Sequence, residues 1–413
     1  MSAAVATLAA VGPLAVGAVP PWPEAVALTA GAALLGIASA WRQSGIVLTV
    51  IAVGSALVMA DAVGRTLLDD VHVRPEDRYA ELWRVDPPAV RYAPGVDTSW
   101  QTLGDLAALG APVAHPRRVR FRTDSLGYRN DPLDGPAEVV LLGDSFAAGV
   151  GTSQEETVAG RLRRTHGLPT VTLAISGASP YDEGVMLDAT LPRLALSPDA
   201  VLVWVLFAGN DFSGTCWDDL PAEPSAWNRL LARTATVRAR SVLGHTLRRL
   251  RASPPAPLAR PLPSGDSMAF YRPDLETIRL SEPEARDLPS ATCVEQTIAH
   301  VQEITGREGL PLLVAVAPMK LQVYGGLVGL PDTPAGTASL LRSFAEERGI
   351  PVLDLEPALR RAAREGLPAR RYIYWQDDTH WSPHGHALVA REIEQQVGDL
   401  RVSQSRSGAS GGP

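Results

Sequence analysis

The sequence predicts a three-layer α/β/α domain with a parallel sheet, preceded by N-terminal transmembrane helices. Three observations lead to this prediction. After about residue 137, short continuous apolar runs alternate with segments of helical character, as in parallel sheets that helices cover on both faces. Polar motifs follow these runs at the carboxyl ends of the strands, where open sheets of this kind place their sites. Residues 1–60, in contrast, carry only Glu24 and Arg42 as charged groups.

The N-terminal segment contains three apolar stretches, Ala3–Val19, Ala25–Trp41 and Gly45–Val63. Each has about the minimum length that spans the hydrocarbon core of a bilayer as a helix. Small residues are abundant in them, which suits close packing of membrane helices. We therefore expect about three spans. A cleaved signal peptide is the alternative for residues 1–19, and a buried soluble helical bundle is the alternative for the whole segment.

The orientation of these spans depends on few charges. Arg42 lies in the short second loop, and the positive-inside tendency places that loop in the cytoplasm. The domain that follows is then extracytoplasmic, although Arg65, just after the third stretch, argues mildly against this orientation. We expect a multi-pass membrane protein with the domain outside.

The α/β pattern gives the remaining boundaries. The strand candidates are Glu138–Leu142, Pro169–Ile175, Ala200–Phe207, Leu310–Ala317 and Pro351–Leu355. The helix candidates are Gln154–Thr165, Asp182–Leu194, Ala291–Gly306, Ala335–Arg348 and Gly385–Val397. The expected organisation is residues 1–63 transmembrane, 64–117 connecting, 118–400 an α/β domain with an insertion at 221–290, and 401–413 a disordered tail. Within the insertion, residues 226–251 could form a basic amphipathic helix at a lid, a membrane surface or a partner.

The charge and the cysteine content exclude some functions and leave others open. A net charge of −7 gives no electrostatic case for nucleic-acid binding. The two cysteines, Cys216 and Cys293, match no zinc or redox motif. They could pair in an oxidising compartment or remain free thiols in the cytosol.

A serine follows the first buried strand candidate. Ser145 stands in the segment Gly143-Asp144-Ser145-Phe146-Ala147-Ala148-Gly149. Nucleophilic catalysis needs a hydroxyl at a strand end, beside backbone N–H groups that are free to bind an oxyanion. A helix-capping serine is the alternative, so this motif alone does not identify a nucleophile.

Two further strand ends offer hydrogen-bond donors. Asn210 follows the third strand candidate in Gly209-Asn210-Asp211, and its amide could donate to the same oxyanion. Gly177 follows the second candidate and could present its N–H. Ordinary turn chemistry explains either residue equally well when each is taken alone.

A histidine segment lies between the last strand candidate and the closing helix, Asp377-Asp378-Thr379-His380-Trp381-Ser382-Pro383-His384-Gly385-His386. An acid close before His380 can hold the imidazole tautomer and stabilise its charged form. A metal site formed by the histidines and aspartates is the competing interpretation. Because Pro383 breaks the register between His380 and the later histidines, we expect no metal and no cofactor.

The order of serine, glycine, asparagine and histidine resembles the SGNH (GDSL-like) hydrolases, whose name lists these four residues. Gly143-Asp144-Ser145, Gly177, Gly209-Asn210-Asp211 and Asp378-Thr379-His380 match the four blocks, within residues 118–398. The lead-in Phe121–Arg129 is similar to that of membrane-anchored members. The Asp-Thr-His-Trp form of the last block is similar to that of bacterial exopolysaccharide O-acetylation proteins, such as those that act on alginate.

The resemblance implies a flavodoxin-like fold of five parallel strands and a serine esterase mechanism. It implies that Ser145 is the nucleophile, that His380 is its base, and that the N–H of Ser145, the N–H of Gly177 and the Asn210 side chain bind the oxyanion. The triad acid is Asp377 by the spacing of many members and Asp378 by the Asp-Thr-His-Trp form. We favour Asp378.

These features predict an extracytoplasmic serine esterase that acts on O-acetyl groups of a polysaccharide or cell-envelope glycan. An O-acetyltransferase would share the acyl-enzyme and would need a membrane partner to supply its acyl donor. A lipid acylhydrolase and a non-catalytic envelope binding module are the remaining alternatives. Retention of Ser145, Asn210 and His380 together argues against the binding module.

Overall fold

The computed structural model describes residues 75–85, 88–212 and 255–409, with isolated helical positions at 52, 55, 56 and 59. The chain divides into two compact units, residues 1–72 with 234–253, and residues 73–233 with 254–413. Apart from the isolated positions, all described residues belong to the second unit. The first two predicted membrane spans, nearly all of the third, and the basic segment 226–251 therefore lie outside the described residues. No helix in the described part combines the length and apolarity needed to cross a membrane.

A five-stranded sheet with the order β11-β10-β7-β5-β6 forms the centre of the second unit, and every pairing in it is parallel. Its strands are β5 (Ala137–Gly143), β6 (Thr170–Ala174), β7 (Leu196–Phe207), β10 (Leu312–Ala317) and β11 (Val352–Asp354). The five predicted strands are confirmed, and β5, β7 and β10 are buried as their apolar sequences require. Register pairs Gly143 with Ala174 and Val205, so β5 and β6 end at one level and β7 continues two residues further, to Phe207.

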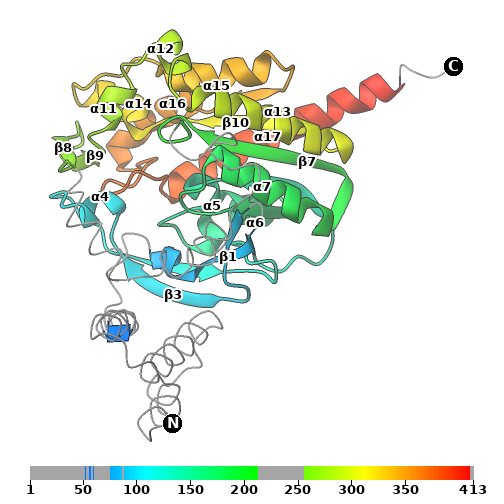
Figure 1. Cartoon of the computed structure of the whole chain (residues 1–413). Helices are drawn as coiled ribbons and strands as arrows, with labels where there is room; N and C mark the ends of the chain where they lie inside the picture. Colours follow the sequence, from blue (N-terminus) through cyan, green and yellow to red (C-terminus); the bar gives the residue numbers. More distant parts are fainter. Residues whose placement is uncertain are drawn as a thin grey trace, which may run out of the picture. The chain divides into compact units, whose positions relative to one another are not determined.

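Helices cover both faces of this sheet, which gives the three expected layers (Figure 1). On one face, α7 (Pro180–Thr190) packs on α13 (Ala291–Arg307), which in turn contacts α15 (Gly336–Glu346). On the other face, α6 (Val158–Thr165) packs on α17 (Pro383–Ala409), beside α16 (Glu356–Gly366). Because β6 lies at the sheet edge and β7 on the far side of β5, right-handed crossovers place α6 and α7 on opposite faces.

The region expected to be a plain connector contains two hairpins. Strand β1 (Ala80–Val85) pairs with β2 (Pro88–Tyr92), and β3 (Asp97–Thr102) pairs with β4 (Arg117–Arg122), both antiparallel. Tyr79, Trp100 and Phe121 stack at centroid distances between 5.3 and 6.3 Å, which ties the short helix η1 (Pro75–Tyr79) to the second hairpin. Between β3 and β4 lies the one-turn helix α4 (Asp105–Ala108).

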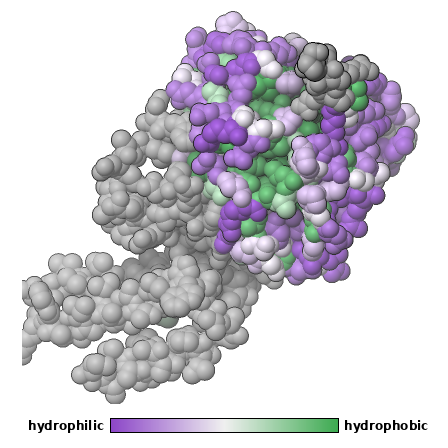
Figure 2. Space-filling view, turned by 90° about the vertical axis from the view of Figure 1, so that its right-hand side faces the viewer, coloured by the Kyte–Doolittle hydropathy of each residue, from purple (hydrophilic) through white to green (hydrophobic). Residues whose placement is uncertain are grey.

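The remaining described elements are short. They are α5 (Ser145–Ala148), β8 (Leu258–Pro261), β9 (Ser267–Phe270), α11 (Asp274–Thr277), α12 (Glu282–Arg286) and α14 (Lys320–Tyr324). The described part of the predicted insertion thus contains the β8–β9 hairpin and two short helices. The expected disordered tail is corrected, because α17 continues through residue 409. One face of the unit carries a band of hydrophobic residues between hydrophilic borders (Figure 2).

Candidate active site

Ser145 is the first residue of α5, directly after the central strand β5. The Asp144 carboxylate caps this helix by accepting a hydrogen bond from the Phe146 backbone N–H at 2.8 Å. A Cβ on Gly143 would lie 2.8 Å from the Ala147 side chain, so the turn requires glycine. The strand end and the cap together fix Ser145, which is only 2% exposed.

The His380 ring lies between Ser145 and Asp378. Its Nε2 atom is 2.8 Å from the Ser145 Oγ atom, and its Nδ1 atom is 2.6 Å from Asp378 Oδ1. The backbone N–H of His380 donates to the same carboxylate oxygen at 3.1 Å. Phe146 packs against the imidazole with a centroid distance of 5.1 Å. These contacts form a continuous hydrogen-bonded chain from hydroxyl to carboxylate.

The two neighbouring acids of the histidine segment have different partners. Asp377 is fully buried and accepts hydrogen bonds from the backbone N–H groups of Gly104 at 3.0 Å and His115 at 2.8 Å. Asp378 faces His380. Burial raises the pKa of Asp378, but the charge and hydrogen bond of His380 and the charge of Arg117 outweigh it and hold that pKa well below its usual range. Asp378 is therefore the acid that the structure brings to the imidazole.

Arg117 and Asp105 were not predicted from the sequence, and both come from the region before the sheet. The Arg117 guanidinium donates to Asp377 at 2.9 Å and to Asp378 at 2.5 Å. The Asp105 carboxylate accepts from the Thr379 backbone N–H at 2.9 Å. Both residues lie more than 250 positions from their partners along the chain. No local pattern could reveal such contacts.

Lys320 also supports the histidine segment. It is the only lysine of the chain, it is 2% exposed, and its ammonium donates to the backbone carbonyls of Trp375, Gln376 and Asp378 at 2.7 to 3.2 Å. Burial lowers the pKa of Lys320 to about 7. A single lysine among many arginines was the one signal in the sequence that pointed to this residue.

Gly177 and Asn210 occupy the ends of the two strands that flank β5. Gly177 lies three residues after β6, at φ 76°, and Asn210 lies three residues after β7. Both positions are exposed, whereas Ser145 is buried. The sheet order thus brings the three predicted oxyanion positions to one edge of the sheet.

Two buried acids lie behind these loops. Glu183 accepts a hydrogen bond from the Trp204 indole N–H at 2.5 Å, and Asp211 accepts from the Phe207 backbone N–H at 2.7 Å. Burial raises the pKa of both carboxyl groups well above the usual range, and the nearby carboxylate of Asp144 adds to this. Neither Glu183 nor Asp211 forms an ion pair with another described residue. Asp211 closes the turn that carries Asn210.

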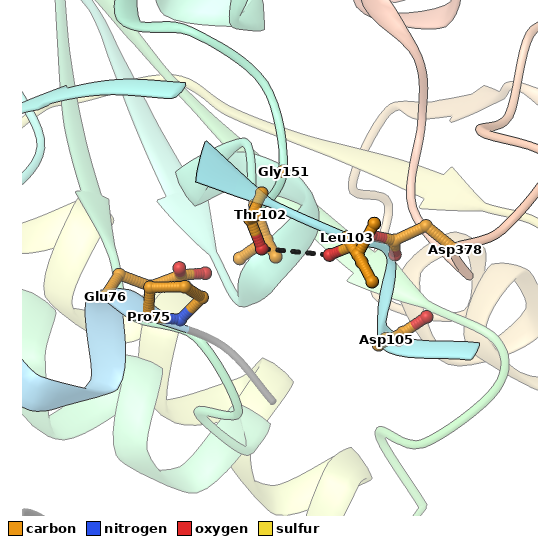
Figure 3. Close-up of a pocket in the computed structure, with 8 residues that line it drawn as sticks. Pro75, Glu76, Thr102, Leu103, Asp105, Gly151 and Asp378 are labelled. Atoms are coloured by element: carbon orange, nitrogen blue, oxygen red, sulfur yellow. Dashed lines mark hydrogen bonds between the residues drawn. The ribbon is translucent and has the colours of Figure 1, made fainter. Parts of the chain in front are cut away.

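A small hollow of about 220 Å³ adjoins the acid side of the site. Asp105 and Asp378 lie together on one side of it, and Pro75 and Glu76 lie on the other (Figure 3). One carboxylate oxygen of Glu76 is buried there without a hydrogen-bond partner among the described residues. The hollow thus adjoins two carboxylates, Asp105 and Asp378, on the side of His380 that faces away from Ser145.

Among the described residues, the histidines and aspartates of residues 377–386, which the competing interpretation grouped as metal ligands, do not all lie at metal-ligand spacing. His386 is buried and packs edge-on against Trp381 at 5.6 Å, and burial lowers its pKa to about 3. Among the described residues, the one group with metal-ligand spacing is Asp105, Asp378 and His380, with ligand atoms within 4.8 Å of one another. The guanidinium of Arg117 already provides a positive charge at Asp378. The donor set therefore suits hydrogen bonding to the imidazole.

Comparison with known proteins gives three findings. Residues 141–388, more than half of the chain, match the GDSL-like Lipase/Acylhydrolase family. A Pseudomonas aeruginosa protein described as "Probable alginate O-acetylase AlgJ" is 30% identical over 128 residues. That alignment covers 30% of this chain and 32% of the relative, so the chain matches about a third of the relative's length.

Solved structures with similarity include a lipolytic G-D-S-L family protein from Veillonella parvula and the acetyl xylan esterase AlAXEase. Their sequence identities are 12% and 15%, and both TM-scores are 0.35. Each comparison covers 63% of this chain, with 97% and 98% of the respective neighbour. The family match places the serine and histidine blocks within one domain, and with it the chain belongs to the GDSL-like lipase/acylhydrolase family of ester-acting hydrolases.

Proposed function

We propose that this protein is a serine esterase that removes O-acetyl groups from a polysaccharide or cell-envelope glycan through a covalent acyl-enzyme. The observation that carries the proposal is the hydrogen-bonded chain Ser145–His380–Asp378, with heavy-atom distances of 2.8 and 2.6 Å. These are the distances over which a base can take a proton from a nucleophile while an acid orients the base.

In the proposed mechanism, Ser145 Oγ attacks the ester carbonyl as His380 Nε2 takes its proton. The ionised carboxylate of Asp378 holds the proton on Nδ1 and stabilises the imidazolium. The oxyanion is bound by the N–H groups of Ser145 and Gly177 and by the Asn210 side chain. His380 then protonates the departing sugar oxygen, and water, activated by the same histidine, releases acetate from Ser145.

The substrate class follows from the family and from similarity to a protein described as an alginate O-acetylase. Both handle acyl esters, and the second is described with a polysaccharide. A deacetylase needs only water as the acyl acceptor, which the exposed strand ends at Gly177 and Asn210 admit. This supports hydrolysis as the principal activity.

The first test is hydrolysis of p-nitrophenyl acetate by the purified full-length protein, beside Ser145→Ala. We expect nitrophenol release that Ser145→Ala lowers by at least about a thousandfold, since removal of a triad member costs this much or more. Ser153→Ala, which removes a hydroxyl that among the described residues bonds only to the backbone of β4, serves as the matched control and should retain full activity. Equal rates for Ser145→Ala and the wild type would reject Ser145 as the nucleophile.

Acetyl transfer is the second candidate, and the similarity to the O-acetylase described above favours it. Water and a sugar hydroxyl would then compete for the same acyl-enzyme. The test uses p-nitrophenyl acetate as donor and an unacetylated oligosaccharide as acceptor, with mass spectrometry of the sugar. An acetylated oligosaccharide that Ser145→Ala does not form would favour the transferase. Release of free acetate alone would favour the esterase.

We also propose that the domain acts outside the cytoplasm and is anchored by the apolar N-terminal stretches. Cys293 on α13 is disulfide-bonded, and the chain has one other cysteine, Cys216. Structural disulfides are typical of oxidising compartments and rare in the cytosol, which supports this location. Thiol titration of the protein isolated without reductant should find no free thiol until it is unfolded and reduced. Two free thiols in the unfolded, unreduced protein would contradict the proposed location.

A further inference from the structure

The contacts of Arg117 converge on the loop that carries the catalytic acid. Besides its bonds to the two aspartates, its Nε–H donates to the Gly151 carbonyl at 2.9 Å. The guanidinium lies over the Trp375 ring, with its carbon 4.3 Å from the centroid. The Arg117 side chain is 8% exposed. The guanidinium also donates to the His115 carbonyl at 3.2 Å, so its planar fork is held by five separate partners.

These contacts decide which oxygen of Asp378 faces the histidine. The Nη2 atom of Arg117 binds Asp378 Oδ2, and only Oδ1 is left for His380 Nδ1. The Nη1 atom binds Asp377 Oδ1, which fixes the rotation of the guanidinium. One rigid cation thus holds two consecutive carboxylates in different directions.

Asp377 closes this arrangement from the other side. Its Oδ2 atom accepts the two backbone N–H groups of the segment 104–115, which leads directly into Arg117. That segment precedes residues 141–388, where the chain matches the family. The support of the catalytic acid therefore comes from outside the part of the chain that defines the family.

We infer that Arg117 is a positioning residue of the esterase, which presents Asp378 to His380 and offsets the negative charge beside the imidazole. The inference rests on the proposed function, because it assigns Arg117 a role in the same reaction. It extends the catalytic unit from the triad to the hairpin β3–β4 that supplies the arginine.

The charges around His380 give the sign of the expected effect. Asp378 lies against Nδ1, Asp105 lies 3.8 Å from the same atom, and the neutral His386 interacts from the same segment. Beyond Asp378 lie two cations, Arg117 at the carboxylate and Lys320 at the backbone carbonyl. Removing the Arg117 charge makes this surrounding more negative, which favours the imidazolium.

The experiment compares Arg117→Met, Arg117→Lys and the control Arg118→Met in the full-length protein. Arg118 is the next residue of β4 and points to the opposite side, and among the described residues its side chain bonds only to Ser99. We expect Arg117→Met to lower kcat for p-nitrophenyl acetate about a hundredfold with KM changed less than about threefold. In the pH profile of kcat/KM for Arg117→Met, the acid limb should move to higher pH, since the histidine then holds its proton more strongly. Arg117→Lys should lose about tenfold in kcat with its limb unmoved, because the charge stays and the fork is lost.

A second readout does not depend on activity. In full-length protein labelled with [15N]histidine, the pH midpoint of the His380 ring should rise in Arg117→Met and stay unchanged in Arg117→Lys and Arg118→Met. The same shift should occur in the Ser145→Ala background, so failure of the proposed function would not hide it. A loss of activity in Arg117→Met without any movement of the midpoint would mean that Arg117 only braces the fold, and the inference would be rejected. If Arg117→Met does not fold, wild-type kcat in Arg117→Lys would reject it equally.

Discussion

Two buried groups of acids lie on either side of the Ser145–His380 contact, and they are accommodated in opposite ways. On the Ser145 side, burial raises the pKa of Glu183 and Asp211, and each accepts a hydrogen bond from an uncharged donor. On the His380 side, the charge and hydrogen bond of His380 and the charge of Arg117 outweigh burial and lower the pKa of Asp378. Equal burial thus yields neutral acids in one place and an ionised acid in the other.

A buried carboxylate can assist a catalytic histidine only while it stays ionised. A carboxyl group without a cation lowers its cost of burial by taking up a proton, and it then cannot stabilise an imidazolium. A carboxyl group that is held by cationic and hydrogen-bonding partners stays ionised and can stabilise that charge. The charge partner, more than the position of the acid, decides which group can orient the base.

The largest expected difference is between the two adjacent acids. Asp378→Asn should lower kcat by about 10⁴, because an amide holds the imidazole in the wrong tautomer. Asp377→Asn should cost less than about tenfold, since Asp377 touches the segment 104–117 and not the ring. Steady-state kinetics with p-nitrophenyl acetate would measure both. Equal losses would remove the distinction between an orienting acid and an anchoring acid.

The nucleophile side can be tested at the oxyanion. Asn210→Ala should lower kcat by about 10² to 10³ with little change in KM, because the lost donor acts on charge that develops in the transition state. Asn210 is exposed, so the midpoint of thermal unfolding should not change. A kcat within twofold of wild type would show that the turn after β7 does not serve the oxyanion.

On the acid side of the site, the backbone at Gly104 lies very close to the backbone of Asp377. A Cβ at Gly104 would lie 1.9 Å from the Asp377 carbonyl oxygen, so Gly104→Ala should destabilise the fold by about 1 to 3 kcal/mol and lower activity. Gly135→Ala, where a Cβ meets nothing within 4 Å, is the matched control and should change stability by less than about 0.5 kcal/mol. Denaturant unfolding measures both free energies. Similar values for the two variants would argue against tight packing at Asp377.

The smallest expected effect concerns the pH dependence of stability, which should differ between the two groups of acids. The raised pKa of Glu183 means that its contribution to stability is present at acid pH and is lost as pH rises through the folded pKa. Glu183→Gln should therefore match wild type near pH 4 and become more stable than wild type by about 1 kcal/mol at pH 8.

Asp378→Asn should behave in the opposite way. The lowered pKa of Asp378 gives stability that is present above about pH 4 and is lost as pH falls through the folded pKa. The variant should be about 2 kcal/mol less stable than wild type at pH 8, and the difference should shrink towards acid pH. Urea unfolding at pH 4, 6 and 8 measures both variants. If the stability difference from wild type changed with pH in the same direction for Glu183→Gln and Asp378→Asn, this contrast between the two groups of acids would be contradicted.

The sequence predicted the nucleophile side better than the acid side, for a physical reason. Continuous apolar runs mark buried parallel strands, so the positions of Ser145, Gly177 and Asn210 at strand ends followed from local pattern. Whether these residues perform the roles assigned to them remains a prediction. The partners of Asp377 and Asp378 could not be found in this way, because Gly104 and Arg117 meet them only through the tertiary fold.

Two further differences have the same origin. The hairpins before the sheet were expected to be a plain connector, because this region has several prolines and no sustained helical period. The extension of α17 through residue 409 was missed because Ser and Gly were taken as signals of disorder. Local composition describes neither cross-strand pairing nor the continuation of a helix that is already formed.

Burial of the only lysine has a practical consequence for chemical modification. The Lys320 amine is enclosed by three carbonyls, and the abundant arginines do not react with ordinary amine-directed reagents. Succinimidyl dyes or activated resins applied to the folded protein are therefore directed to its α-amino group. Amine-directed labelling of the folded protein should therefore leave Lys320, and the histidine segment that it supports, unmodified.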